Sequence, residues 1–212
     1  MKLKEILIMA TSAALITSCS NNPVSDIQNE LEIEEVTYTL DTENSSLVWK
    51  GMMSPEYFHV GNITISDGTI SMKNDVLSSG TFTVDMNSIT ATISDDFPED
   101  KANYLAGHLM GTVTDEDHPA NLFFNTPKFP NTTVTLGEYN NGKLDITLSI
   151  IGKELKQTIP ATISSDDDEA AINGTFTLDL SSLEIPGLQA DSETGEGISP
   201  SVEFKLDLQL NK

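Results

Sequence analysis

The feature that most constrains the fold is a strict alternation of apolar and polar residues. Residues 202–210 (VEFKLDLQL) alternate without a fault, and 175–180, 143–150 and 81–86 repeat the pattern. Successive side chains of a β-strand point to opposite faces, so a period of two predicts strands with one buried and one solvated face. The outward positions carry Thr, Ser, Asp, Lys and Gln, which is typical of an antiparallel sheet with one face in water.

Turn-forming residues divide the alternating segments. Asp67-Gly68, Ser79-Gly80, Asn140-Asn141-Gly142 and Asn173-Gly174 have the composition of tight turns. The candidate strands, some of which merge, are 36–41, 46–51, 60–66, 69–73, 79–87, 119–126, 132–138, 143–150, 155–163, 172–180 and 201–210. About eight or nine strands at hairpin spacing predict an all-β fold, either an antiparallel barrel or a sandwich.

One segment departs from the period of two. In residues 95–111 (DDFPEDKANYLAGHLMG), acidic residues follow Pro98 and apolar residues recur at intervals of three to four. This pattern predicts one short helix. The sequence shows no internal repeat and no second core, so residues 36–212 are expected to form a single domain.

Residues 1–18 have the pattern of a signal peptide. Two lysines precede an apolar run over 6–16, which is too short to span a bilayer as a helix. The run ends in LITSC (15–19), which resembles the bacterial lipobox, where the peptidase cuts before the cysteine and the thiol becomes acylated. Cys19 is the only cysteine of the chain and is the predicted lipid-attachment residue. The alternative is a secreted protein whose cysteine follows its signal by chance.

Residues 19–35 are expected to be an acidic tether between the lipid and the domain. The sixteen residues after Cys19 contain little that could be buried, and as a flexible coil they would span about 20–24 Å. Ser20 follows the cysteine, which by analogy with lipoprotein sorting favours the outer membrane over the inner one. The predicted location is therefore the bacterial cell envelope, with the domain held to the membrane by acylated Cys19 and its acyl chains.

The charge of the chain excludes several partners. It has 33 Asp and Glu against 11 Lys and no Arg, for a net charge of −22. Such an acidic protein, which lacks guanidinium groups to hold phosphates, is a poor binder of nucleic acid or of anionic lipid headgroups. The single cysteine also excludes an intramolecular disulfide framework.

Five collinear motifs resemble the YceI family of bacterial periplasmic and secreted proteins over about residues 36–210. They are YTLDTENSSLVWKG (38–51), HVGNITISDG (59–68), SSGTFTVDMNSIT (78–90), LAGHLMG with DEDHPANLFF (105–124) and KLDITLSIIGKELKQTIP (143–160). The chain departs from the family at Gly111-Thr112-Val113, where the family has Asp-Phe-Phe, and at Leu180, where the family commonly has Arg.

The resemblance implies a lipocalin-like antiparallel β-barrel of about eight strands with one short helix, whose interior holds a long isoprenoid chain such as a quinone tail. No other cofactor is implied, and whether the domain forms a homodimer stays open. The strand phase nominates these inward side chains as candidate barrel-lining, ligand-binding residues: Tyr38, Leu47, Trp49, Phe82, Val84, Met86, Phe124, Ile146, Leu148, Ile150, Phe176, Leu178, Phe204 and Leu206. The alternative is a structural or interaction protein with a solid core and no ligand.

The sequence gives no support for catalysis or for a metal centre. His59, His108 and His118 fall in different elements, without the His-x-His or His-Glu-x-x-His spacing of a metal site. The acidic run 166–169 lacks the glycine and the spacing of a calcium loop. No Gly-x-Ser-x-Gly elbow and no phosphate-binding glycine loop is present. We therefore expect a binding protein rather than an enzyme.

The lipobox interpretation predicts that Cys19→Ala abolishes lipid attachment, because the thiol is the acylated atom. Cells that express the unaltered chain should incorporate radioactive palmitate into it, and cells that express Cys19→Ala should not. Ser20→Ala is the matched control and should still be labelled. Label on the Cys19→Ala variant would show that the lipobox interpretation is wrong.

Overall fold

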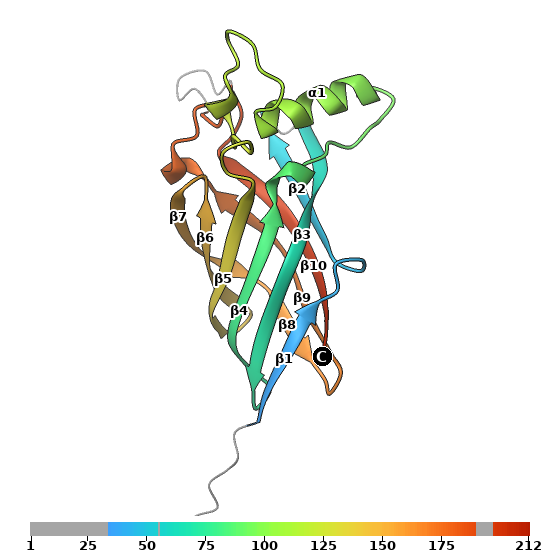
Figure 1. Ribbon diagram of the computed structural model, residues 1–212, viewed down its shortest axis with the longest axis vertical. Coiled ribbons are helices and arrows are strands. Elements are labelled where there is room, and N and C mark those ends of the chain that lie inside the picture. The colour runs from blue at the N-terminus through green and yellow to red at the C-terminus, as the bar shows by residue number, and fades with distance from the viewer. Residues whose placement is uncertain (1–33, 55, 190–196) are drawn as a thin grey trace, which may run out of the picture. The chain divides into compact units, whose positions relative to one another are not determined.

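The computed structural model describes residues 34–54, 56–189 and 197–212, which are dominated by β-strands (Figure 1). The predicted signal peptide and Cys19 lie outside the described residues, as does all of the predicted tether except its last two residues. The strands are β1 (Glu35–Leu40), β2 (Ser46–Met52), β3 (Phe58–Lys73), β4 (Val76–Asp85), β5 (Asn131–Asn140), β6 (Lys143–Ile150), β7 (Lys153–Pro160), β8 (Thr162–Ser165), β9 (Glu169–Asp179) and β10 (Ser201–Asn211). The all-β prediction is confirmed, with ten strands in place of about eight.

All of these strands belong to one antiparallel sheet. Its order is β7-β6-β5-β4-β3-β1-β10-β9-β8, and β2 pairs with β3 and β10. β1 and β2 therefore take the same place between β3 and β10, one towards each end. Between them the Asp41 carboxylate accepts hydrogen bonds from the backbone N–H groups of Glu43 and Asn44, both at 3.1 Å. β1 and β2 thus act as one strand interrupted by a turn.

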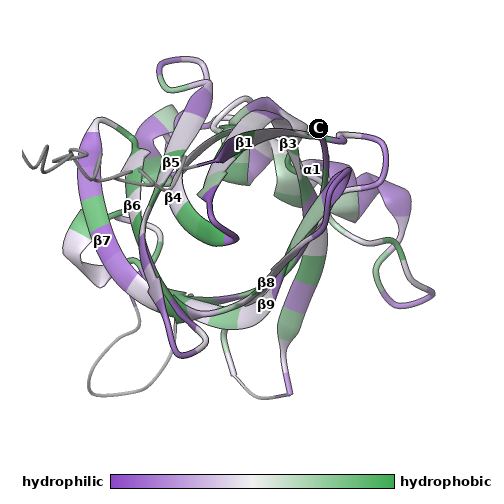
Figure 2. Cartoon of the chain, turned by 90° about the horizontal axis from the view of Figure 1, so that it is seen from below, coloured by the Kyte–Doolittle hydropathy of each residue, from purple (hydrophilic) through white to green (hydrophobic). Residues whose placement is uncertain are grey.

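The sheet closes into a barrel where β7 and β8, which are separated only by Ala161, run beside β9 (Figure 2). β8 pairs with β9 through a backbone ladder, and side chains join β7 to β9. The Gln157 amide donates to the Asp179 carbonyl at 2.7 Å and accepts from the Asp179 N–H at 3.3 Å. Lys153 Nζ donates to the Leu183 carbonyl at 2.5 Å, and Leu183 lies in the 3₁₀-helix η3 (Ser181–Leu183) that follows β9. No backbone ladder joins β7 to β9 within the described part of the chain. The predicted barrel is therefore confirmed, and its closing boundary is held by side chains along β7 and by a backbone ladder along β8.

The predicted strand 119–126 is wrong. This segment contains the short 3₁₀-helix η2 (Ala120–Leu122) and then runs along the end of the helix α1 (Glu99–Met110). The Phe124 N–H donates to the Leu109 carbonyl at 3.1 Å, and the Thr126 N–H donates to the Met110 carbonyl at 2.8 Å. The last carbonyl groups of a helix have no hydrogen-bond partner within the helix. Phe124 and Thr126 donate to two of these carbonyls instead of pairing with a neighbouring strand.

The predicted turn at Asp67-Gly68 is also wrong, because 60–66 and 69–73 belong to the single strand β3. A Cβ at Gly68 would lie 2.0 Å from Cδ1 of Phe82, so glycine is required there by the ring that crosses it. The chain reverses instead at Asn74 and Asp75, which both have positive φ, 49° and 62°. Two residues with positive φ form the tight hairpin turn that suits twisted strands.

Of the three remaining turn predictions, two are wrong and one is confirmed. Ser79-Gly80 and Asn173-Gly174 lie inside β4 and β9, so those two predictions are wrong. Asn141 and Gly142, with φ of 51° and 74°, form the predicted hairpin turn between β5 and β6. Glycine and asparagine therefore occur both in turns and at strand positions where another side chain lies close. Their presence alone does not predict a turn.

The predicted short helix is confirmed as α1, which lies over one end of the barrel (Figure 1). Glu99 and Asp100 occupy its first turn, where the positive end of the helix dipole favours acidic side chains. The helix ends at Gly111, whose φ of 73° is the left-handed conformation of a helix C-cap. Within the described ranges, no helix has the length and apolar character needed to cross a bilayer.

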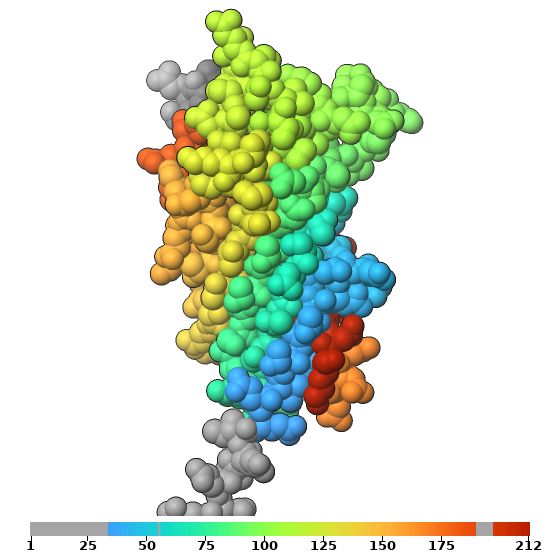
Figure 3. Space-filling model, viewed as in Figure 1, coloured from blue at the N-terminus to red at the C-terminus, as the bar shows by residue number. Residues whose placement is uncertain are grey.

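The two ends of the barrel differ in what they contain. At the end where β1 begins, Glu35 is paired with Lys73 and the β3–β4 turn reverses the chain. We call this the closed end. At the other end lie α1 and the loops that precede and follow it, which Figure 3 shows in green and yellow-green. We call this the entrance end.

A test of the packing at the entrance end is the replacement of Gly61, which pairs with Trp49 across β2 and β3. A Cβ at Gly61 would lie 1.8 Å from the Thr90 carbonyl oxygen, which also accepts the Trp49 indole N–H at 3.1 Å. Gly61→Ala should lower the free energy of unfolding in urea by about 1–3 kcal/mol or more. Gly51→Ala is the control, since a Cβ there would lie 3.5 Å from its nearest neighbour, which is an ordinary van der Waals contact. Equal stability of the two variants would show that the packing around Trp49 is described wrongly.

Candidate functional site

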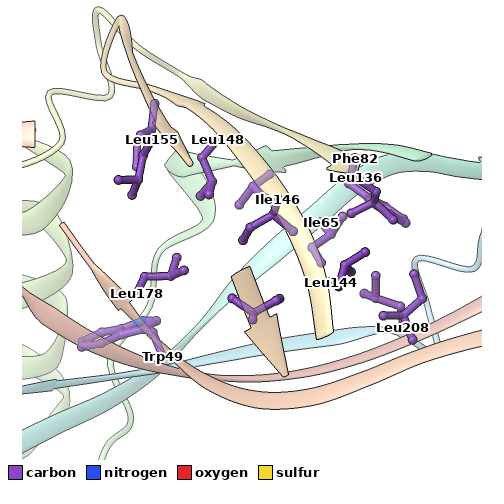
Figure 4. Packing of buried hydrophobic residues seen from close by; sticks show 14 of the residues in the cluster. Trp49, Ile65, Phe82, Leu136, Leu144, Ile146, Leu148, Leu155, Leu178 and Leu208 are labelled. Atoms are coloured by element: carbon purple, nitrogen blue, oxygen red, sulfur yellow. The ribbon is translucent and has the colours of Figure 1, made fainter. Parts of the chain in front are cut away.

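The inner face of the barrel surrounds an apolar cavity of about 120 Å³. Strands β2 to β7, β9 and β10 all contribute lining side chains, so the cavity is the lumen of the barrel. Figure 4 shows Phe82, Ile146 and Leu148 projecting inward from β4 and β6. Thr132 is the only lining residue with a polar side chain, and its buried Oγ1 has no hydrogen-bond partner among the described residues.

A second cavity, of about 260 Å³, lies at the entrance end. One wall is formed by Trp49 and the β2–β3 connection, and another by Leu105 and Leu109 of α1. The side chains that line both this entrance cavity and the inner cavity are Ile63, Phe124, Leu180 and Phe204. The two spaces are therefore neighbours within one apolar interior, divided only by side chains.

Outside the entrance cavity lies an open cleft of about 460 Å³ between β3 and α1. It shares His59 and Leu105 with the entrance cavity. The His59 ring lies 4.3 Å from the Phe97 ring, and the Tyr104 ring stacks on the His108 ring at 5.9 Å, measured between centroids. The outer cleft is thus aromatic and polar, whereas the inner cavity is aliphatic.

The two histidines of the outer cleft favour the neutral form. Burial lowers the pKa of His59 below its ordinary value. The pKa of His108 is lowered by burial first and then by the charge of His118, and the Asp115 carboxylate opposes this shift. His118 Nδ1 lies 2.8 Å from the nearer carboxylate oxygen of Asp115. No group of three or more His, Cys, Asp or Glu side chains in the described ranges is arranged to hold a metal ion.

The structure brings nearly all of the candidate lining residues together around the two cavities, and their role in binding stays a prediction. Trp49 lines the entrance cavity. The inner cavity is lined by Leu47, Phe82, Val84, Met86, Phe124, Ile146, Leu148, Ile150, Phe176, Leu178, Phe204 and Leu206. Phe124 and Phe204 line both spaces.

Tyr38 lies apart from the other candidates. It is buried, as the strand phase predicts, but it lines neither of the two cavities. β1 pairs with the last residues of β3 and so lies at the closed end. There the Tyr38 hydroxyl donates to the Asp166 carbonyl at 2.5 Å, and its pKa is raised by burial first and by the nearby Asp166 carboxylate second.

The strand phase also identifies residues that the candidate set omits. Ile63, Ile65, Leu144, Ile159, Ile172 and Leu208 line the inner cavity and continue the alternation of their strands. The loop and helix residues of the entrance cavity, such as Met53, Leu105 and Leu188, have no such signal. Their position depends on how the loops fold over the barrel, which a period of two does not encode.

Exposed apolar side chains also gather in the segments around the entrance. Met53, Tyr57, Phe58, Ile93, Tyr104 and Val113 are all exposed and belong to the β2–β3 connection, to α1 or to the segments beside α1. Such a cluster on a soluble domain usually marks an interaction site. It lies on segments that also line the entrance cavity and the outer cleft.

Comparison with known proteins identifies the domain. The sequence profile of the YceI-like domain matches residues 38–210. No individually curated protein matches the chain in sequence.

Solved structures with a similar fold include a polyisoprenoid binding domain from Saccharophagus degradans that is implicated in plant cell wall breakdown. It is 14% identical with a TM-score of 0.56, and the match covers 82% of this chain and 97% of that one. BcnA from Burkholderia cenocepacia is 16% identical with a TM-score of 0.59, and the match covers 80% of this chain and 98% of that one. At these identities the likeness establishes the fold.

The histidine shifts predict how stability depends on pH. Because the pKa values of His59 and His108 are lowered in the folded protein, the unfolded chain binds protons more readily below their ordinary value of 6.5. The free energy of unfolding should therefore fall as the pH drops from about 7.5 through 6.5 towards the lowered values. The carboxylates with lowered pKa act only near or below 3.8, outside this window.

Urea unfolding between pH 7.5 and 5.5 measures this dependence. The double variant His59→Gln with His108→Gln should show a shallower fall than the unaltered protein. The same slope in both proteins would mean that neither histidine is held in the neutral form by the fold.

Proposed function

The chain belongs to the YceI-like domain family, and on that basis we propose that it binds an isoprenoid or another amphiphilic lipid inside its barrel without catalysing a reaction. The observation that carries the proposal is the pair of adjoining apolar cavities, of about 120 and 260 Å³. A protein interior is normally packed with few voids larger than a water molecule. An aliphatic space of this size inside the barrel suits a hydrocarbon chain.

The distribution of polar groups supports one orientation of the ligand. The inner cavity has only the Thr132 hydroxyl as a polar lining group, and the outer cleft has His59, Asp100, Lys101 and His108. A hydrocarbon tail would therefore lie in the barrel, and the polar head would lie at His59, which lines both the entrance cavity and the outer cleft. This is the arrangement that leaves the fewest polar groups without partners.

The side chains that line the two cavities also support binding rather than catalysis. Among the residues that line the inner and entrance cavities, the ionisable side chains are those of Tyr57 and His59. Acid–base or nucleophilic catalysis needs a reactive side chain oriented by a second group within hydrogen-bond reach. The rings of Tyr57 and His59 meet edge to face at 5.3 Å between centroids, and no hydrogen bond between them is found in the described part of the chain.

The domain from Saccharophagus degradans, whose fold is similar to that of this chain, is a polyisoprenoid binding domain. The carrier function proposed for this chain is of that kind. The alternative function, a structural or interaction protein with a solid core, is consistent with the packed closed end but leaves the two cavities without a role.

We further propose that the domain is a lipoprotein of the bacterial cell envelope, anchored through Cys19 and more suited to the outer membrane than the inner one. The described fold shows at which end of the barrel such a tether would join. The chain enters the barrel at Glu35, which is paired with Lys73 at the closed end. β3 runs from there to Phe58 at the entrance end over 16 residues, or roughly 50 Å. The tether would therefore join the barrel at the end opposite the entrance.

Filling the inner cavity should abolish lipid binding. Val84 lines this cavity from β4, so Val84→Phe should weaken farnesol binding at least tenfold by taking the space that the tail requires. Thr81→Phe is the matched control, because Thr81 is on the same strand and exposed. Binding is measured by the fluorescence of Trp49, the only tryptophan of the chain, whose ring lines the entrance cavity.

Thermal unfolding should first show that both variants fold. Equal binding by Val84→Phe and Thr81→Phe would place the ligand outside the inner cavity. Native mass spectrometry of the protein purified from its own host provides an independent measurement. The absence of any bound lipid there, together with no response of Trp49 to added isoprenoids, would support the solid-core alternative.

A further inference from the structure

We propose that the ligand tail is short, with room in the barrel for about three isoprene units and no more. This inference rests on the proposed lipid-binding function and specifies the ligand by its length. It is carried by the volumes of the two cavities and by the packing that closes the barrel below them. Neither observation depends on which headgroup the lipid carries.

The volumes set the amount of hydrocarbon that fits. An apolar cavity of about 150 Å³ in another protein holds a six-carbon benzene ring, which is roughly 25 Å³ for each carbon. On that scale the entrance cavity of about 260 Å³ holds about ten carbons. The inner cavity of about 120 Å³ holds about five more. A chain of about fifteen carbons therefore fills both spaces.

The floor of the inner cavity prevents a longer chain from passing further into the barrel. Leu136 lines the cavity, and Ile70 is fully buried and lines neither cavity; the two pair with Gly80 of β4 from the strands on either side of it. Between them, a Cβ at Gly80 would be 2.7 Å from Cδ1 of Leu136 and 3.1 Å from Cγ2 of Ile70. The space there cannot take even one added methyl group without movement.

Below this floor the barrel is filled by side chains. Tyr38, Leu40, Ile70, Met72 and Leu210 are buried and line neither cavity. Tyr38 is further fixed by the hydrogen bond of its hydroxyl to the Asp166 carbonyl. To admit a longer tail, these side chains would have to leave a close-packed core, and displacing them is destabilising.

The experiment is a competition among prenyl alcohols of increasing length. Geraniol, farnesol, geranylgeraniol and solanesol have two, three, four and nine isoprene units and the same uncharged head. The full chain is incubated with them in pairs, and native mass spectrometry measures which alcohol is bound. Farnesol should bind at least tenfold more tightly than geraniol, because each added carbon is buried. Geranylgeraniol and solanesol should gain less than threefold over farnesol, because their extra carbons stay outside.

Two other results of this competition would contradict different parts of the proposal. A tenfold or greater preference for geranylgeraniol or solanesol over farnesol would overturn the length limit and leave the lipid-binding function intact. Binding of none of the four alcohols would contradict the proposed function itself, and the length limit with it.

A pair of variants tests whether the floor sets the limit. Leu136→Ala removes a side chain from the floor of the cavity and should move the preference towards geranylgeraniol by at least threefold. Leu40→Ala is the matched control, since Leu40 and Leu136 are both 8% exposed but Leu40 lines neither cavity. It should leave the preference unchanged. The same shift in both variants would overturn the assignment of the floor. The competition on the unaltered chain decides the length limit even if a variant fails to fold.

Discussion

The fold depends on the pairing of its last strand. β10 pairs with β9 over its whole length, and on its other side it pairs with β2 near its start and with β1 near its end. This joins residues that are more than 150 positions apart, such as Leu47 and Leu206. Contacts of this kind require a long loop to close before they contribute stability, and they are typical of slowly folding barrels. Without β10 the sheet would have two open edges and no enclosed interior.

This closure determines how the barrel is divided between structure and binding. Because β1 and β2 share one place beside β10, the barrel wall continues past the turn that separates them. The β1 half encloses packed side chains and the β2 half encloses the cavities. The acidic residues that give the chain its charge of −22 lie mostly on the outward strand positions and in loops. The protein thus keeps its apolar space and its charge on opposite faces of the same sheet.

The period of two predicts the fold class and the inward face well, because both follow from which side of a strand each residue occupies. It places Phe82, Ile146 and Leu178 around the lumen without any knowledge of the neighbouring strands. It fails where a tertiary contact decides the local structure. Gly68 is inside a strand because of the Phe82 ring, and the predicted strand before Thr126 is replaced by hydrogen bonds to the end of α1. The alternation also cannot show that Tyr38 lies below the floor of the cavity, since inward residues have the same pattern at every height of a barrel.

The boundary between β7 and β9 gives the barrel a mechanical property that a fully laddered cylinder lacks. Gln157 joins β7 to Asp179 of β9 with side-chain hydrogen bonds, whereas backbone ladders hold the other strands together, including β8 and β9. Long side chains can change rotamer and still keep a partner, but a ladder can lengthen only by breaking. The girth of the wall can therefore adjust along β7, towards the entrance end, while the ladder between β8 and β9 keeps the strand register fixed. Under the proposed binding function, the width and the length of the bound molecule would be limited by different parts of the protein, the width by this boundary and the length by the packed floor.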